Sequence, residues 1–153
     1  YKRPGYGLEP PQSESHLMDV LDGIDCGGIS VVNWLSHPQM LQLLCCSACH
    51  LALSYPYTLS WSVLEAMACG TPLISNIGSP IAANLQHDRD ALLVPFNDVD
   101  ALAQAMVTLL QEPKRAQRLG NQARETMQRS FNLVAASKAY EELFRQMIGP
   151  NKP

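Results

Sequence analysis

The stretch Ser62-Val-Leu-Glu-Ala-Met-Ala-Cys-Gly-Thr-Pro-Leu-Ile-Ser75 decides the fold of this chain of 153 residues. Residues 62–69 are mostly apolar and include good helix formers, and Gly70 is the residue type that often ends a helix. Pro72 cannot continue a helix, and residues 72–75 form a short apolar run that favours a buried strand. A helix followed directly by a buried strand is typical of a parallel α/β sheet.

The same alternation extends in both directions along the chain. We expect four strands, at residues 29–34, 50–54, 72–75 and 91–94. Helices are expected between them, at residues 62–69 and 79–86 and from residue 36 onward. Short apolar strands that alternate with helices predict a Rossmann-like parallel sheet covered on both faces, which is an α/β fold. Ligands bind such sheets outside the carboxyl ends of the strands.

Three further helices are expected after the last strand. Asp98 can cap the first of them, Pro113 suits the first turn of the second, and the third spans residues 133–148. In the third helix, the spacing of apolar residues predicts an inward-facing side made of Tyr140, Leu143, Phe144 and Met147. The expected organisation is therefore an irregular segment at residues 1–28, at the edge of a fragment, and one domain at residues 29–150.

The composition excludes several classes of protein. Apolar residues make up 46% of the chain and charged residues 16%, which excludes global disorder. The net charge of −3 argues against nucleic-acid binding through bulk positive charge. No uninterrupted apolar run reaches the roughly 18 residues that a transmembrane helix needs. The chain begins at Tyr1 rather than Met, and we interpret it as a fragment of a longer protein.

The cysteines and histidines give no metal or disulfide pattern. Five cysteines are an odd number, which favours reduced thiols and a cytoplasmic location. Cys46 and Cys49 form a C-x-x-C pair, but no second pair of ligands accompanies them, and the four histidines are not spaced as metal ligands. We therefore expect buried structural thiols and no metal site.

A candidate binding site lies in the turn that follows the strand expected at residues 50–54. The turn is rich in Ser, Thr and Tyr, and a helix is expected to begin near Ser60 to Ser62. Free backbone N–H groups at a helix start suit a phosphate, although one exposed helix end contributes only about 0.3–1 kcal/mol. Glu65 lies about one turn inside this helix, where it either binds sugar hydroxyls or interacts with the helix dipole.

The run from Ser60 to Pro72, which contains Leu-Glu-Ala-Met-Ala-Cys-Gly-Thr-Pro, and the run Ala91-Leu-Leu-Val-Pro95 resemble a known family. It is the "group 1" family of retaining glycosyltransferases, which use nucleotide-sugar donors and have the GT-B fold. The resemblance covers residues 29–148. In that family two Rossmann-like domains face each other across a cleft. The resemblance implies that this chain is the later part of the C-terminal, donor-binding domain.

The resemblance also implies an activity, which is retaining hexosyl transfer from a nucleotide-diphosphate sugar without a cofactor or a metal. It assigns no catalytic residue to this chain. A saccharide or lipid-linked acceptor would be held by an N-terminal domain outside the chain. The family's Arg and Lys that clamp the diphosphate have no match here, so we expect the isolated chain to be inactive.

The resemblance implies specific contacts to the donor. Glu65 matches the second Glu of the family's Glu-x7-Glu motif, which holds the ribose hydroxyls. Tyr57 stands where the first Glu is expected, so a neutral hydroxyl replaces the usual charged contact to the donor sugar. Trp34 and Leu35 correspond to the contact with the nucleotide base. The donor-binding residues implied in this way are Tyr57, Thr58, Ser60, Trp61, Ser62, Val63 and Glu65.

Other readings of the chain remain open. The missing charge at Tyr57 favours, as an alternative, a non-catalytic module that binds or senses a nucleotide sugar. A flavodoxin-like or receiver-like domain is less favoured, because the expected strands do not end in the acidic residues that a receiver needs. The helix that begins at Pro113 is basic, and we favour a solvated face over contact with an anionic membrane at its inner surface. Its basic residues are Lys114, Arg115, Arg118, Arg124 and Arg129.

Overall fold

The computed structural model describes residues 28, 30, 32, 34–54 and 59–149. The chain divides into two compact units, Tyr1–Met40 and Leu41–Pro153. In the first unit, residues 34–36 are irregular and precede the first turn of helix α2 (His37–Cys46), whose later residues belong to the second unit. The second unit holds the sheet. The domain boundary expected after residue 28 stays a prediction.

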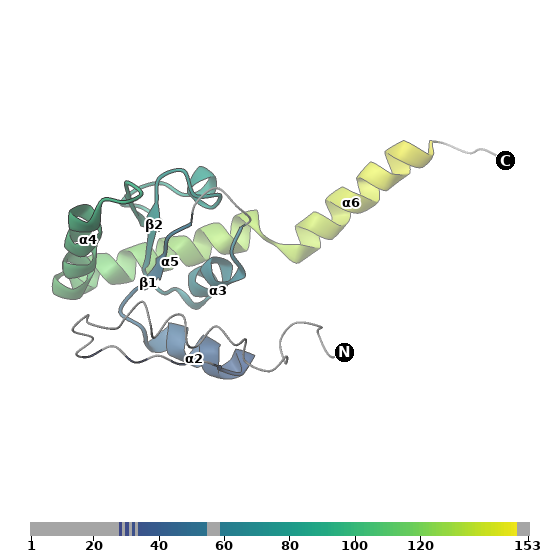
Figure 1. Ribbon diagram of the computed structural model, residues 1–153. Helices are drawn as coiled ribbons and strands as arrows, with labels where there is room; N and C mark the ends of the chain where they lie inside the picture. The colour runs from purple at the N-terminus through teal and green to yellow at the C-terminus, as the bar shows by residue number, and fades with distance from the viewer. Residues whose placement is uncertain (1–27, 29, 31, 33, 55–58, 150–153) are drawn as a thin grey trace, which may run out of the picture. The chain divides into compact units, whose positions relative to one another are not determined.

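Three parallel strands form the sheet of the second unit (Figure 1). They are β1 (His50–Ala52), β2 (Leu73–Asn76) and β3 (Leu92–Val94), in the spatial order β1-β2-β3. His50 pairs with Leu73, and Ile74 pairs with Leu92. The strands expected at residues 50–54, 72–75 and 91–94 are confirmed to within a residue or two at their ends. Helices flank the sheet, so the α/β fold class is confirmed.

The strand expected at residues 29–34 is not part of this sheet in the residues that the structure describes. Ser30, Val32 and Trp34 have no regular secondary structure, and Ile29, Val31 and Asn33 lie outside the described residues. Val32 and Trp34 are both exposed. A short apolar run has no period of its own that identifies a strand, and this one lacks the burial that would make it one.

The helices of the second unit begin where the sequence predicts. Helix α3 spans Trp61–Cys69, and Gly70 ends it in the left-handed conformation, with φ of 76°. Helix α4 (Val99–Gln111) starts after Asp98, whose carboxylate accepts a hydrogen bond from the Ala101 N–H at 2.9 Å. Helix α5 (Pro113–Ser130) has Pro113 as its first residue. These signals act locally, so the sequence alone locates them.

The helix expected at residues 79–86 is reduced to the short 3-10 helix η1 (Ala82–Asn84). The chain is already extended at Leu85, with φ of −118° and ψ of 148°. The next N–H, that of Gln86, donates to the buried Asp90 carboxylate at 3.0 Å instead of to a helical carbonyl. A competing local hydrogen bond from the backbone to a side chain therefore ends this helix early.

The core consists of two apolar clusters on the two faces of the sheet. Leu73 belongs to the cluster that includes residues of α3, and Ile74 belongs to the cluster that includes residues of α4. Successive residues of a strand point to opposite faces, so β2 contributes to both. Helix α5 joins the two clusters, because it gives Ala123 to the first and Leu119 to the second. Helices α3 and α5 cross closely at Gly70 and Gly120.

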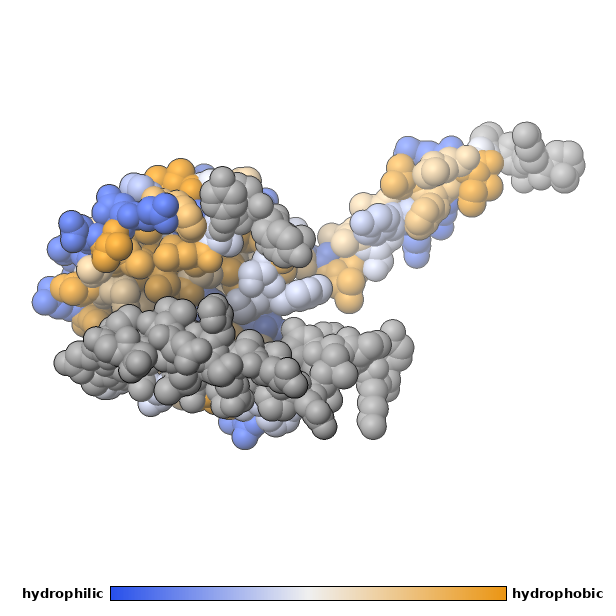
Figure 2. Space-filling view, viewed as in Figure 1, coloured by the Kyte–Doolittle hydropathy of each residue, from blue (hydrophilic) through white to orange (hydrophobic). Residues whose placement is uncertain are grey.

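Helix α6 (Leu133–Ile148) has no buried residue. Tyr140 and Phe144 stack on each other with ring centroids 6.3 Å apart, yet they are 62% and 55% exposed. Figure 2 shows apolar side chains along the surface of this helix. The expectation that Tyr140, Leu143, Phe144 and Met147 face inward is wrong for this structure. The apolar stripe is present, but helical spacing does not say what covers it.

The basic residues of α5 are partly used in ion pairs. Arg115 Nε donates to the Asp88 carboxylate at 2.8 Å, and Arg118 Nη1 donates to the Asp88 carbonyl oxygen at 2.7 Å. The hydrogen bond from Arg115 lowers the pKa of Asp88. Asp88 adopts a positive φ of 58°, so these contacts hold an unusual backbone turn.

In the part of the chain that the structure describes, no helix is long and apolar enough to cross a membrane.

The cysteines are less buried than the sequence predicts. Cys45 and Cys46 are exposed, and Cys49 and Cys69 are half-buried. All four are free thiols, and Cys26 lies outside the described residues. The expectation of buried structural thiols is wrong for Cys45 and Cys46, because α2 presents its last turn to solvent.

Candidate functional site

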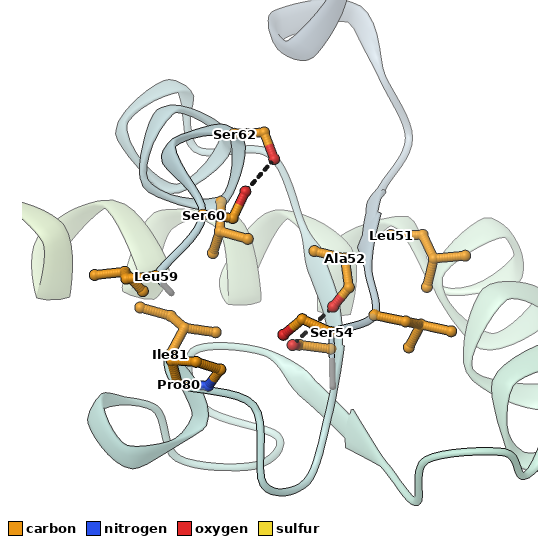
Figure 3. A pocket seen from close by; sticks show the side chains of 11 residues that line it. Leu51, Ala52, Ser54, Leu59, Ser60, Ser62, Pro80 and Ile81 are labelled. Carbon is orange, nitrogen blue, oxygen red and sulfur yellow. Dashed lines mark hydrogen bonds between the residues drawn. The ribbon is translucent and has the colours of Figure 1, made fainter. Parts of the chain in front are cut away.

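A pocket of about 460 Å³ lies where β1 ends and α3 begins (Figure 3). This volume falls in the usual range for small-molecule sites, roughly 300–1,000 Å³. In the close-up view, Ser60 and Ser62 lie on one side of the pocket, and Pro80 and Ile81 lie on the other. The lining residues are Leu51, Ala52, Leu53, Ser54, Leu59, Ser60, Ser62, Val63, Ser75, Pro80 and Ile81.

The start of α3 supplies polar groups to the pocket. Ser60 is the N-cap residue, in an extended conformation with ψ of 130°, but its side chain does not cap the helix. Its hydroxyl instead lies 2.9 Å from the Ser62 hydroxyl, and the two share a hydrogen bond. The first N–H groups of a helix have no carbonyl partner within it, and they carry the positive end of the helix dipole. This edge of the pocket can therefore donate to a negatively charged oxygen.

The ends of the strands supply the second polar group of the pocket. The Ser75 hydroxyl donates to the Ala52 carbonyl oxygen at 2.9 Å and lies 3.0 Å from the Ser79 hydroxyl. Ser75 and Ser79 are both buried. These bonds tie β2 to β1 beside the pocket, and they satisfy polar groups that would be costly to bury alone.

Asn76 fixes the end of β1. It is 2% exposed, and its Oδ1 accepts a hydrogen bond from the Ser54 N–H at 2.8 Å. Its Nδ2 donates to the Ser54 carbonyl oxygen at 3.0 Å and to the Ile77 carbonyl oxygen at 3.2 Å. One side-chain amide thus replaces the next pair of ladder bonds after Ala52. It holds Ser54 in place just beyond the end of β1.

No charged side chain lines the described part of this pocket. Its polar groups are hydroxyls and backbone groups, and the rest of its wall is aliphatic. Such a site can orient a polar ligand by hydrogen bonds, but it cannot neutralise a double negative charge. Within the described residues there is also no group of three or more His, Cys, Asp or Glu close enough to hold a metal ion.

The structure brings together three of the residues that the sequence suggests for the site. Ser60, Ser62 and Val63 line the pocket. Trp61, which is 69% exposed, and Glu65, which is half-buried one turn further along α3, are not among the lining residues.

The roles of the other suggested residues remain predictions. Tyr57 and Thr58 lie outside the described residues. Trp34 is exposed and Leu35 is half-buried, and both belong to the separate Tyr1–Met40 unit.

Several pocket residues were not suggested by the sequence. Ser54 and Ser75 are at the ends of expected strands, so the rule that ligands bind at the carboxyl ends of parallel strands could have identified them. Asn76, which does not line the pocket but holds Ser54 at its edge, has no sequence motif around it. Pro80 and Ile81 reach the pocket only through the tertiary fold, for which residue spacing gives no signal.

A model of the family described as "Glycosyl transferases group 1" matches residues 5–112. Among curated relatives, the chain is similar to the exopolysaccharide phosphotransferase SCO2592 of Streptomyces coelicolor, with 36% identity over 87 residues. It is also similar to the N-acetyl-alpha-D-glucosaminyl L-malate synthase of Bacillus anthracis, with 28% identity over 114 residues. These matches cover 56% and 74% of this chain. They span only 9% and 30% of the two relatives.

Solved structures show the same similarity. The sucrose-phosphate synthase of Thermosynechococcus elongatus matches 88% of this chain and 34% of its own, with a TM-score of 0.76 and 28% identity. The Alr3699/HepE protein of Anabaena, in complex with UDP-glucose, matches 85% of this chain and 36% of its own, with a TM-score of 0.76. Its 15% identity shows a common fold alone. Because the family model covers more than half of the residues, the chain belongs to the group 1 glycosyltransferases of the GT-B fold, a family of transferase enzymes.

Proposed function

We propose that the chain forms the donor-binding part of a retaining hexosyltransferase that uses a nucleotide-diphosphate sugar. The observation that carries this proposal is the start of α3, where Ser60 and Ser62 open into a pocket of about 460 Å³ beyond the strand ends. N–H and hydroxyl donors at such a point are the groups that bind phosphate and sugar oxygens. The Anabaena protein with the same fold, described in complex with UDP-glucose, supports the choice of ligand.

The pocket and three residues outside its described lining each have a role in this proposal. The first-turn N–H groups of α3 and the hydroxyls of Ser60 and Ser62 donate to the diphosphate. Glu65, one turn further along the helix, accepts hydrogen bonds from the ribose hydroxyls. Tyr57 and Thr58 contribute to the contact with the sugar. The aliphatic wall of the pocket, including Ile81, excludes water from the bond that breaks.

The missing charge determines what the chain can do alone. In the transfer, the bond between the anomeric carbon and the diphosphate oxygen breaks, and the nucleoside diphosphate leaves with the electron pair. One helix end contributes only about 0.3–1 kcal/mol, far less than such a leaving group requires. We therefore propose that basic groups outside the described pocket complete the site. The isolated chain then binds the donor without transferring sugar, and an acceptor saccharide or lipid-linked acceptor is held elsewhere in the protein.

The direct test is a thermal-shift titration with UDP, GDP and ADP and with their glucose and mannose conjugates. A ligand that binds only the folded chain raises its stability by RT ln(1 + [L]/Kd), so we expect a shift with one base and its sugar conjugate. S62A and E65Q should reduce this shift. The matched surface substitutions S137A and E141Q on α6 should leave it unchanged. If none of these nucleotides raises the unfolding temperature of a protein that carries the complete site, the proposal is wrong.

The substitution at Tyr57 supports a second candidate, which is a module that binds or senses a nucleotide sugar without transferring it. The two candidates differ in the fate of a radiolabelled donor that is incubated with the longer protein. A transferase moves the labelled sugar to an acceptor with retention of the anomeric configuration. A sensor binds the donor but releases it intact. In that case the Y57E variant at most binds the donor more tightly, and it still transfers no sugar.

A further inference from the structure

The C-terminal end of α3 contacts α2 through side chains. The Thr71 hydroxyl donates to the Leu44 carbonyl oxygen at 2.7 Å, and the Cys69 Sγ lies 4.0 Å from the Leu41 carbonyl oxygen. In an α-helix the carbonyl of residue 41 accepts from the N–H of residue 45. The Cys69 sulfur therefore approaches α2 at the turn that ends with Cys45.

The Cys45 side chain also points toward this place. Every Cα–Cβ bond of a helix tilts toward the N-terminus, so the Cys45 thiol leans back over the turn that holds Leu41. The pKa of the Cys69 thiol reflects the same contact, because burial raises it first and a hydrogen bond with the Cys45 side chain raises it further. One geometric and one electrostatic observation thus indicate that the two sulfurs lie close together.

The other described cysteines have no comparable contact. Burial alone raises the pKa of Cys49, with no contribution from another thiol. Cys46 follows Cys45 directly in α2, so its side chain leaves the helix about 100° away from that of Cys45. Cys45 is exposed, which lets a dissolved oxidant reach it, whereas Cys69 is half-buried behind it.

We propose that Cys45 and Cys69 form a reversible disulfide that links α2 to α3 when the protein meets a low-molecular-weight disulfide. The Cys45 thiolate attacks one sulfur of the small disulfide, forms a mixed disulfide and releases one small thiol. The Cys69 thiolate then attacks the Cys45 sulfur and releases the second small thiol. The two cysteine sulfurs are oxidised and the two small-molecule sulfurs are reduced, so the two protein thiols become one disulfide and the small disulfide becomes two thiols.

The test oxidises the full folded chain with oxidised glutathione, blocks the remaining thiols with an alkylating reagent and maps the linkage by mass spectrometry. Trypsin is unsuitable, because no Lys or Arg occurs between Arg3 and Arg89, and all five cysteines stay in one fragment. A glutamate-specific protease cleaves after Glu65 and separates Cys69 from the other cysteines. We expect two cross-linked fragments that dithiothreitol separates, and a folded protein lighter by two hydrogen atoms.

Single substitutions identify the partner of Cys69. The cross-link should disappear in C45S and persist in C46S, which changes the next residue of the same exposed turn. In denaturant, oxidation should distribute Cys69 among several partners, so selectivity for Cys45 should require the folded chain. Because Cys69 has a raised pKa, native oxidation should become faster as the pH rises toward that pKa.

Three results would overturn the proposal. They are a cross-link that survives in C45S, a bond between Cys46 and Cys49 in place of it, or a Cys69 that remains fully alkylated after native oxidation. Circular dichroism of each variant confirms that it has folded, so a negative result in a folded C46S protein also counts against the proposal.

Discussion

Asn76 uses both ends of its amide to hold Ser54, and its own exposed fraction is 2%. In N76A, the Ser54 N–H and carbonyl lose their partners in a part-buried place. We expect the free energy of unfolding to fall by about 1–3 kcal/mol, as for other broken buried hydrogen bonds. Urea unfolding measures this. The same substitution at the exposed Asn84 is the control, and an equal loss there would refute the role of Asn76.

His50 should make stability depend on pH. Its Nε2 is buried and has no hydrogen-bond partner among the residues that the structure describes, and burial lowers its pKa below 6.5. Above pH 6.5 the residue is neutral in both states and has no effect on the free energy of unfolding. As the pH falls from 6.5 toward the lower pKa of the folded state, the unfolded chain binds the proton more readily, and stability decreases.

Urea unfolding of the wild type and of H50F at pH 7.5 and pH 5.5 tests this expectation. The wild type should lose more stability between the two pH values than the variant does. The comparison removes the effect of every other titrating group, because both proteins carry them. An equal loss in the two proteins would show that His50 does not titrate in this range.

At the scale of elements, the crossing of α3 and α5 requires a glycine. A Cβ placed on Gly120 would fall on the Gly70 carbonyl oxygen and come within 3.0 Å of the Gly70 carbonyl carbon. Both are backbone atoms, so no side chain can move aside. In an exposed helix, Gly to Ala is stabilising by roughly 0.5–1 kcal/mol.

We therefore expect G120A to be destabilised by at least about 1 kcal/mol, in the opposite direction, because the two helices must separate. Thermal unfolding measures the sign. N121A, at the next and exposed position of α5, is the control for helix propensity. A more stable G120A protein would show that the crossing tolerates a methyl group.

The sequence predicts the elements that local signals determine, and it does not predict the contacts between them. Gly70, Asp98 and Pro113 mark helix ends through their own backbone chemistry, and all three are confirmed. The short helix η1 is shorter than its apolar pattern predicts, because a bond to Asp90, four residues beyond Gln86, competes with it.

The candidate site also has a part that the sequence predicts and a part that it does not. Ser60 and Ser62 belong to a helix start that the sequence identifies, and they line the pocket. Pro80 reaches the same pocket only because β2 lies beside β1, which residue spacing does not reveal. The fold and one side of the pocket could thus be predicted, whereas the opposite side could not.

At the scale of the whole molecule, we expect α6 to be dispensable for the stability of the sheet and its helices. It has no buried residue, whereas Phe131, just before it, packs against the apolar cluster of Leu73. A chain that ends at Asn132 should keep its free energy of unfolding to within about 0.5 kcal/mol. A chain that ends at Arg129 should be less stable, since it also loses Phe131. Equal stability losses in the two truncated chains would contradict this division.

The pocket without charged side chains lies in a stretch, residues 4–88, that contains neither Lys nor Arg. No charge on a lining side chain therefore draws a dianionic ligand into the described part of the pocket. The rate at which such a ligand enters the pocket then gains nothing from attraction to lining side chains. Basic groups supplied by another part of the protein would increase that rate and make it sensitive to salt. Capture and orientation of the ligand are thus separable, and this chain supplies the orientation.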